Sequence, residues 1–127
     1  MIVVDASAAL AALLNDGQAR HLIATERLHT PHLIDSEIAN GLRRLVQRNQ
    51  LSAADGWNVL RTWRRLAVTR YPAHGLFGRM WEIRENFSAY DATYVALAET
   101  LDCALVTADA RLGHARQAQC AITIVSR

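Results

Sequence analysis

Short apolar runs alternate along this chain with longer stretches whose apolar residues recur at helical spacing, and this alternation constrains the fold most. The runs Ile2–Val4, Cys103–Val106 and 121–125 are interpreted by length and composition as buried strands. Two further extended segments reach Pro31 and cover 67–71. Strands that alternate with helices predict a parallel sheet with helices on both faces. The 127 residues suit one domain with one core. We therefore expect a single α/β domain over residues 1–127, around a central parallel sheet of about four to five strands.

Helix patterns fill the segments between these strands. Three helices are expected in the first part of the chain: one that follows residue 4 and stops at 15–17, one over 19–27, and one that starts near Asp35 or Ser36. A fourth covers 52–66, and a fifth has residues 76, 80, 83 and 87 on its core face. A sixth covers 88–101, and a short one follows residue 109. Gly41 and Gly56 fall inside expected helices, where glycine costs about 1 kcal/mol relative to alanine. They mark either local kinks or close packing.

Four acidic residues stand where an expected strand gives way to a helix, or where a helix begins. Asp5 follows the first strand and Asp109 follows the 103–106 strand, whereas Glu37 and Asp91 lie in the first turns of expected helices. In right-handed βαβ units each strand ends at the edge where the next helix begins, which is also the edge where open α/β sheets bind ligands. Four carboxylates gathered there would repel one another unless a divalent cation held them together. The pattern therefore predicts a metal site.

Each of these acids, taken alone, has a second interpretation. Aspartate is common at helix N-caps, and an acid in the first turn of a helix is stabilised by the helix dipole. Glu37 and Asp91 fit this description individually, and Asp55 is assigned to it. The occurrence of four such acids at one edge favours a shared site over chance capping.

Oxygen ligands determine which metal the site would take. Carboxylates without histidine or cysteine suit Mg²⁺ or, as a substitute, Mn²⁺, which keep several waters and bridge to substrate phosphates. Such an ion acidifies a bound water, so that hydroxide can attack phosphorus at neutral pH. The five histidines have no metal-ligand spacing to one another.

The composition narrows the setting of the chain. The formal charge of +2 is too small to imply a polyanion-binding protein, but all fourteen basic residues are arginine, which suits phosphate and carboxylate. A codon bias toward arginine would give the same count. Cys103 and Cys120 follow no disulfide or zinc pattern and indicate thiols in a reducing compartment. The apolar N-terminus lacks a basic region and contains Asp5, and no run reaches membrane-spanning length. We therefore expect a cytoplasmic protein that does not enter a membrane.

Four segments of the chain carry a recognisable pattern: VVDASAAL at the start, SEIANGLRRL in the middle, SAYDATYVALAE later and LVTADARL near the end. Together they resemble PIN-domain ribonucleases, and among these the VapC toxins of bacterial toxin–antitoxin pairs. The resemblance covers nearly the whole chain, in the right order. YDATYVALAE followed by LVTADARL is highly specific, whereas VVDAS alone is not. The resemblance implies Mg²⁺-dependent endonucleolytic cleavage of RNA, with 5′-phosphate and 3′-hydroxyl ends, a homodimer, and inhibition by a small cognate antitoxin.

Residue by residue, the acidic site of the family falls on the same four acids: Asp5, Glu37, Asp91 and Asp109. Asp5 and Asp91 are the expected direct ligands, and the other two complete the cage or act through water. Ser7 and Thr107 match small hydroxyl positions that support the ligands, and Asn40 matches a polar position that faces the site.

Basic and aromatic residues on the third and fourth expected helices suggest two contact surfaces. If these helices pair, their arginines would flank a groove for RNA that leads to the acids; Arg43, Arg44 and Arg64 are the main candidates. The alternative is the solvated face of an amphipathic helix. Trp57, Leu60 and Trp63 form an apolar line that is either core or an antitoxin-binding surface, since aromatics are enriched at partner contacts.

Other proteins place acids similarly. A receiver domain needs an acid pair after its first strand and a lysine, and this chain has one acid there and no lysine. A phosphatase with an aspartate nucleophile would carry a second aspartate where Ser7 stands. A non-catalytic PIN-like binding module usually loses one or more acids, and none is lost here. A PIN nuclease of RNA processing or DNA cleavage, without an antitoxin, remains the alternative within enzymes; a gene for a short DNA-binding protein immediately upstream would distinguish the two.

Overall fold

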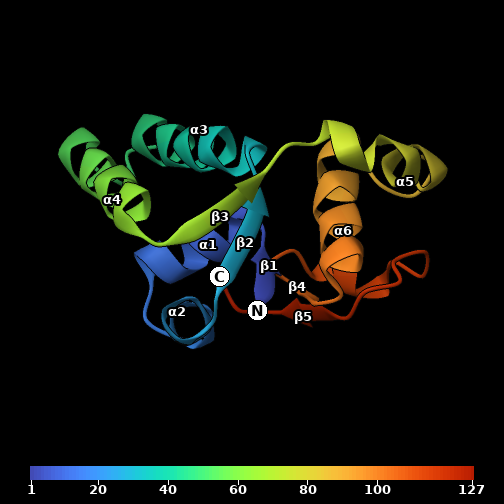
Figure 1. Cartoon of the computed structure of the whole chain (residues 1–127). Coiled ribbons are helices and arrows are strands. Elements are labelled where there is room, and N and C mark those ends of the chain that lie inside the picture. Colours follow the sequence, from blue (N-terminus) through green and yellow to red (C-terminus); the bar gives the residue numbers. More distant parts are fainter.

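A five-stranded parallel sheet forms the centre of the computed structural model, which describes residues 1–127 (Figure 1). Its strands are β1 (Ile2–Val4), β2 (Leu28–Pro31), β3 (Val68–Tyr71), β4 (Ala104–Thr107) and β5 (Ile122–Ile124), in the order β3-β2-β1-β4-β5. All four pairings are parallel. The expected α/β fold with a parallel sheet of four to five strands is therefore confirmed.

The strand order reverses between β1 and β4, and this reversal positions the candidate site. The chain runs outward from β1 through β2 to β3, and then returns to the other side of β1 as β4 and β5. Val4 pairs with Val106 in the register of β1 and β4. The residues that follow this pair, Asp5 and Thr107, consequently lie side by side at the carboxyl edge, which is the switch point where such sheets bind ligands.

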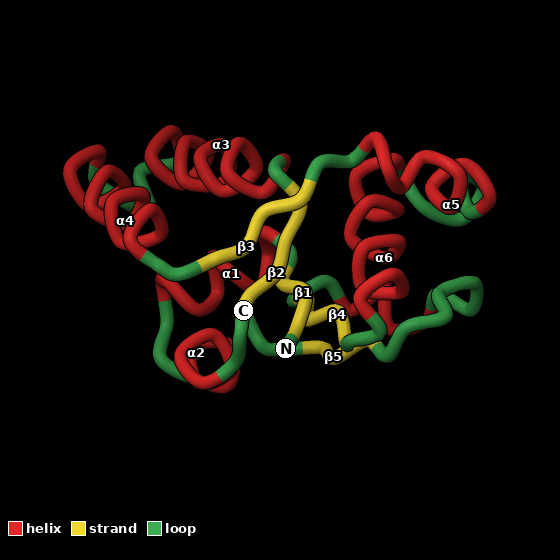
Figure 2. The backbone as a smooth tube through the Cα atoms, in the orientation of Figure 1, coloured by secondary structure: helices red, strands yellow, loops and turns green.

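Helices cover both faces of the sheet, as expected. They are α1 (Ala6–Leu14), α2 (Gln18–Thr25), α3 (Leu33–Gln47), α4 (Ala53–Arg65), α5 (Phe77–Glu82) and α6 (Ala89–Leu101), with short 3₁₀ helices η1 (His74–Leu76) and η2 (Ala110–His114). Figure 2 shows α1 to α4 on one side of the sheet and α5 and α6 on the other. None of the helices is both long enough and apolar enough to cross a lipid bilayer.

Helix α6 is the central helix of the core and begins beside the site. Its residues 92–98 are all buried, because the helix packs on β1, β2 and β4. A helix that is apolar on every side belongs inside a protein. Only its first turn, which carries Asp91, reaches the carboxyl edge of the sheet.

Two expected helix boundaries were wrong. Helix α3 begins at Leu33, not near Asp35 or Ser36, so that Asp35 lies in the first turn and Glu37 in the second. The acid that was interpreted as a start signal sits inside the helix, where the dipole also favours it. Helix α5 ends at Glu82 rather than continuing to Phe87. Ile83 and Phe87 are buried as predicted, but they lie in turns and not in a helix. Within these turns the Arg84 guanidinium donates a hydrogen bond to the Trp81 carbonyl.

Close packing explains Gly41, which lies where α3 approaches α1. A Cβ atom at this position would stand 2.5 Å from Leu10 Cδ1. The glycine therefore leaves room for the end of the Leu10 side chain of α1, and Glu37 stands one turn before it on the same helix. At Gly56 a Cβ would make ordinary contact with Val46, so the same argument does not apply there.

The two cysteines are free thiols, both partly buried. This agrees with the expectation that they form no disulfide. Burial raises the pKa of the Cys120 thiol to about 11, so this thiol is protonated and unreactive at neutral pH.

Candidate active site

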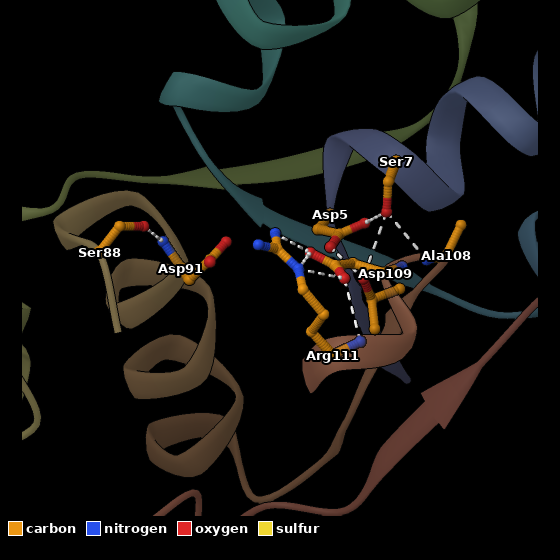
Figure 3. Close-up of polar contacts among 8 residues, drawn as sticks. Asp5, Ser7, Ser88, Asp91, Ala108, Asp109 and Arg111 are labelled. Atoms are coloured by element: carbon orange, nitrogen blue, oxygen red, sulfur yellow. Dashed lines mark hydrogen bonds and ion pairs between the residues drawn. The ribbon is translucent and has the colours of Figure 1, made fainter. Parts of the chain in front are cut away.

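Asp5 is the most buried and best anchored of the four acids (Figure 3). It directly follows β1 and caps α1, and only 7 % of the residue is exposed. Its Oδ1 accepts hydrogen bonds from the Ser7 hydroxyl at 2.7 Å and from the Ala8 amide at 2.9 Å, and its Oδ2 accepts one from the Thr107 hydroxyl. These contacts fix the orientation of the carboxylate.

The hydroxyls of Ser7 and Thr107 also tie the segment after β1 to the segment after β4. The Ala108 amide donates to Ser7 Oγ at 2.8 Å, and the Asp109 amide donates to Thr107 Oγ1 at 3.0 Å. The structure thus places both residues against Asp5 and at the base of Asp109. Their role in supporting metal ligands, which the family resemblance implied, stays a prediction.

Glu37 and Asp91 approach the same edge from α3 and α6. Both are half-buried. The hydroxyl of Tyr94, which is itself 2 % exposed, donates to Glu37 Oε1 at 2.6 Å. Ser88 caps α6 by accepting a hydrogen bond from the Asp91 amide at 3.1 Å. Neither carboxylate has a cationic partner, and Asp5 has none either.

Tyr94 was not identified from the sequence. It lies three residues after Asp91 on α6, within the segment YDATYVALAE, and this i, i+3 spacing puts both side chains on one face of the helix. That spacing was a usable signal. The partner of Tyr94, however, is on a different helix, which only the tertiary structure reveals.

The electrostatics show that the acids share one environment. Burial raises the pKa values of Asp5, Glu37 and Asp91 above their ordinary values. Their neighbours add to this effect: the charges of Asp5 and Asp91 raise the pKa of Glu37, and those of Asp5 and Asp109 raise the pKa of Asp91. Three partly buried carboxylates therefore repel one another, and the only cation that offsets part of this effect is Arg111, whose charge lowers the pKa of Asp91.

Asp109 differs from the other three because Arg111 forms an ion pair with it. The guanidinium donates from Nη2 to Oδ2 at 2.6 Å and from Nε to Oδ1 at 3.0 Å. This contact holds the pKa of Asp109 below its ordinary value. Figure 3 shows the guanidinium between Asp109 and Asp91. Sequence reasoning missed Arg111, although its place two residues after Asp109 makes such contact possible.

The donor set suits a hard divalent cation, although the side chains stand too far apart in this arrangement to hold one. All the candidate donors are carboxylate oxygens, the type that Mg²⁺ and Mn²⁺ prefer. No three acidic, histidine or cysteine side chains lie close enough together to coordinate one ion. To hold one ion, these side chains would have to move. The charges of Asp5 and Glu37, which no cation offsets, would favour those movements when a divalent cation is available.

Comparison with known proteins identifies the family. The PIN domain family model matches residues 2–118. The chain belongs to the PIN domain family. It is 76 % identical to Ribonuclease VapC9 of Mycobacterium tuberculosis, over the full length of both chains. Among solved structures it resembles PAE2754 of Pyrobaculum aerophilum, with a TM-score of 0.76, 25 % identity, and coverage of 97 % of this chain and 83 % of the other. It also has the fold of VapC20, a sarcin–ricin-loop-cleaving toxin of Mycobacterium tuberculosis, with a TM-score of 0.64, 20 % identity, and coverage of 91 % and 95 %.

The remaining predicted site residues of this PIN domain lie on α3 and α4. Asn40, Arg43 and Arg44 are exposed on α3, and Asn40 stands three residues after Glu37, on the same face of the helix. Arg64 lies on α4 with its guanidinium 5.8 Å from the centre of the Trp57 ring. None of these side chains lines the cavity that contains Asp91 and Asp109.

The apolar line on α4 divides into a core residue and a surface residue. Trp63 is 3 % exposed and donates from its ring nitrogen to Asp35 at 2.7 Å, so the core interpretation is correct for it. Trp57 is 54 % exposed. Together with Leu60 and Arg64, Trp57 lines a cavity of about 350 Å³ on the PIN domain surface. Of the three residues predicted to bind a partner, Trp57 and Leu60 are available to do so.

Proposed function

We propose that this PIN domain is a metal-dependent endoribonuclease, and that it acts as the toxin of a toxin–antitoxin pair by hydrolysing phosphodiester bonds of RNA. One observation carries the proposal: Asp5, Glu37 and Asp91 lie at the switch point of the sheet as mutually repelling carboxylates that form no ion pair. Nuclease chemistry is supported by the 76 % identity to a protein named as a ribonuclease.

The residues that would hold the ion are Asp5, Glu37, Asp91 and Asp109, with Mg²⁺ as the expected metal and Mn²⁺ as a substitute. A divalent ion in such a site supplies Lewis-acid chemistry, because it makes water more acidic and offsets the negative charge that develops on phosphate. Ser7 and Thr107 keep the Asp5 carboxylate fixed in its orientation. Tyr94 holds only Oε1 of Glu37, so its other oxygen stays available to a ligand.

An antitoxin, a second copy of the chain and RNA are the partners in this proposal. The exposed ring of Trp57, with Leu60 and Arg64 beside it, offers an amphipathic helix both apolar contact and a cation. RNA contacts remain assigned to the exposed Arg43, Arg44 and Arg64. The homodimer and the cytoplasmic location rest on the resemblance to VapC toxins and on the free thiols.

Replacement of Asp5 tests the proposal most directly. The variant Asp5→Asn should lose cleavage of RNA down to background, because a neutral amide cannot replace a buried carboxylate ligand. The measurement is the cleavage of end-labelled RNA in the presence of Mg²⁺ or Mn²⁺, with transcript ends mapped across the cell after induction of each protein.

The matched control is Asp16→Asn, which neutralises an exposed acid in the loop after α1. This control should cleave as the wild type does. Cleavage that persists in Asp5→Asn at the wild-type rate, with both variants folded by circular dichroism, would contradict the assignment.

A further inference from the structure

Two adjoining cavities lie beside Asp91 and Asp109, and only the first is lined by these acids. The first, of about 350 Å³, is lined by Asp91, Asp109 and Arg111 among others. The second, of about 500 Å³, is lined by six residues: Asn86, Arg111, His114, Ala115, Arg116 and Gln117. The two share Asn86, Arg111 and Ala115, so the second cavity opens onto the first.

The chemistry of the second cavity is that of an anion site. Its lining has two guanidinium groups, an imidazole and two carboxamides, and it contains no acid and one small apolar residue. Arg116 is exposed and forms no ion pair or hydrogen bond within the protein. Guanidinium groups bind phosphate through paired hydrogen bonds. A negatively charged group of a polynucleotide fits this lining better than a base, which needs an aromatic or apolar wall.

Ion-pair and hydrogen-bond contacts fix the loop that carries Arg116. The Glu99 carboxylate, whose side chain is 12 % exposed, pairs with Arg79 at 2.7 Å and accepts the Gln119 amide at 2.7 Å. Arg79 in turn donates to the Gln117 carbonyl at 2.9 Å. These contacts fix the backbone at residues 117 and 119, so the loop after η2 is held in one conformation.

Arg111 lines both cavities and forms a single ion pair, with Asp109. Its side chain is 86 % exposed and binds only Asp109, which is one of the expected metal ligands. An exposed ion pair is weak, because water and salt compete for both groups. A divalent cation on Asp109 would compete with Arg111 for the carboxylate and leave the guanidinium free for another anion.

We propose that the second cavity binds a phosphate group of the RNA strand next to the bond that is cut, and that Arg111 moves from Asp109 to this phosphate when the metal ion binds. The inference rests on the proposed nuclease function and adds the residues that position its substrate. Arg111 and Arg116 are the two cations of this phosphate site. In the metal-free protein, Arg111 also offsets the negative charge of Asp109.

RNA binding tests the phosphate site. The affinity for a 20-nucleotide single-stranded RNA with phosphorothioate linkages, which keep the backbone charge and slow hydrolysis, would be measured by fluorescence anisotropy over a range of salt concentrations. Mg²⁺ is present and every protein keeps all four acids, so that the metal ion can compete with Arg111 for Asp109. Arg111→Ala and Arg116→Ala should each weaken binding and reduce the slope of log affinity against log salt by about 0.7, the value for one phosphate contact on a single strand. The control is Arg27→Ala, an exposed arginine directly before β2, at the opposite edge of the sheet, and its slope should be unchanged.

Metal binding tests the exchange of partners. Calorimetric titration with Mn²⁺, on proteins that keep all four acids, should show tighter binding for Arg111→Ala than for the wild type, because the competing guanidinium is gone. Arg116→Ala should bind Mn²⁺ as the wild type does. All three arginines are exposed, so these variants are expected to fold.

Two results would overturn the inference. Salt slopes for Arg111→Ala and Arg116→Ala equal to that of Arg27→Ala would remove the cavity from the RNA site and point to a protein partner instead. An Mn²⁺ affinity that is unchanged or weaker in Arg111→Ala would overturn the exchange. Either result with a wild type that still cleaves RNA leaves the nuclease proposal standing, whereas a wild type that neither binds nor cleaves RNA contradicts that proposal itself.

Discussion

Asp5, Glu37 and Asp91 work against the stability of the metal-free fold when they are ionised. Burial is the main cause, since a desolvated carboxylate loses hydration that the protein only partly replaces. For Asp5 the bonds from Thr107, Ser7 and Ala8 lower the pKa again, but burial outweighs them. Evolution tolerates such local costs at functional sites and compensates for them elsewhere in the structure.

The pH dependence of stability follows from the direction of these shifts. In the unfolded chain the carboxyl pKa values are 3.8 for aspartate and 4.5 for glutamate, and in the folded protein the pKa values of these three acids are higher. At pH values between the two, the native state binds more protons than the unfolded chain. The free energy of unfolding of protein treated with EDTA should therefore fall as pH rises through this window. Urea unfolding at a series of pH values measures it.

The pKa values of Asp35 and Asp109 are shifted downward, and these shifts affect stability at lower pH. The pKa values of both are held down by arginine partners, so their contribution is lost as pH falls through those lowered values. Asp5→Asn should flatten the fall in stability above about pH 4 without changing the acid limb. A variant with the same profile as the wild type would show that Asp5 does not carry a raised pKa.

At the scale of elements, one carboxylate joins α3, α4 and β3. Asp35, in the first turn of α3, accepts the ring nitrogen of Trp63 from α4 and the paired donors of Arg70 from β3, all at 2.7 to 2.9 Å. The Arg70 guanidinium also lies 5.8 Å from the centre of the Trp63 ring. The α3–α4 pair is thereby fixed to the sheet edge, and this pair carries both Glu37 and the exposed Trp57.

Removing this carboxylate should destabilise the fold. In Asp35→Ala the buried ring nitrogen of Trp63 loses its acceptor, which costs about 1–3 kcal/mol in the free energy of unfolding. Asp35→Asn keeps an acceptor oxygen for Trp63 and loses only the charge, so its loss should be smaller. Urea unfolding of the three proteins gives the values. Equal stability of Asp35→Ala and the wild type would show that water replaces the carboxylate.

At the scale of the whole molecule, the chain order of the strands brings the acids together. β1 and β4 are neighbours in the sheet although 102 residues separate Asp5 from Thr107. Helices α3 and α6 then add Glu37 and Asp91 from opposite faces of the sheet (Figure 1). A ligand that binds this edge therefore links both helical layers and should stabilise the entire domain.

Metal binding should consequently raise the melting temperature of the protein. An ion that binds only the folded state adds about 2.7 kcal/mol of stability at a hundredfold excess over its dissociation constant, roughly 10 °C for a domain of this size. Differential scanning fluorimetry with EDTA, Mg²⁺ or Mn²⁺ measures the shift. In Asp5→Asn the shift should shrink to a few degrees or less. A wild-type melting temperature that neither ion changes would count against the metal site.

The sequence alone was sufficient for the strand–helix alternation and for the position of the four acids near one edge of the sheet. Short buried strands follow from apolar runs such as Ile2–Val4, and helix starts follow from local caps such as Ser52 and Ser88. The rule that parallel strands end at one edge was enough to bring Asp5 and Asp109 together. These properties are local, or follow from a topological rule, so that periodicity and caps encode them.

Only the tertiary structure could decide which partner each side chain meets. Arg111 neutralises Asp109, Tyr94 binds Glu37, and Trp63 is buried against Asp35 while Trp57 on the same helix remains exposed. Each of these outcomes depends on how far one element lies from another and on which side chain fills the space between them. Such distances arise from the packing of the whole core, and a pattern along the chain does not encode them.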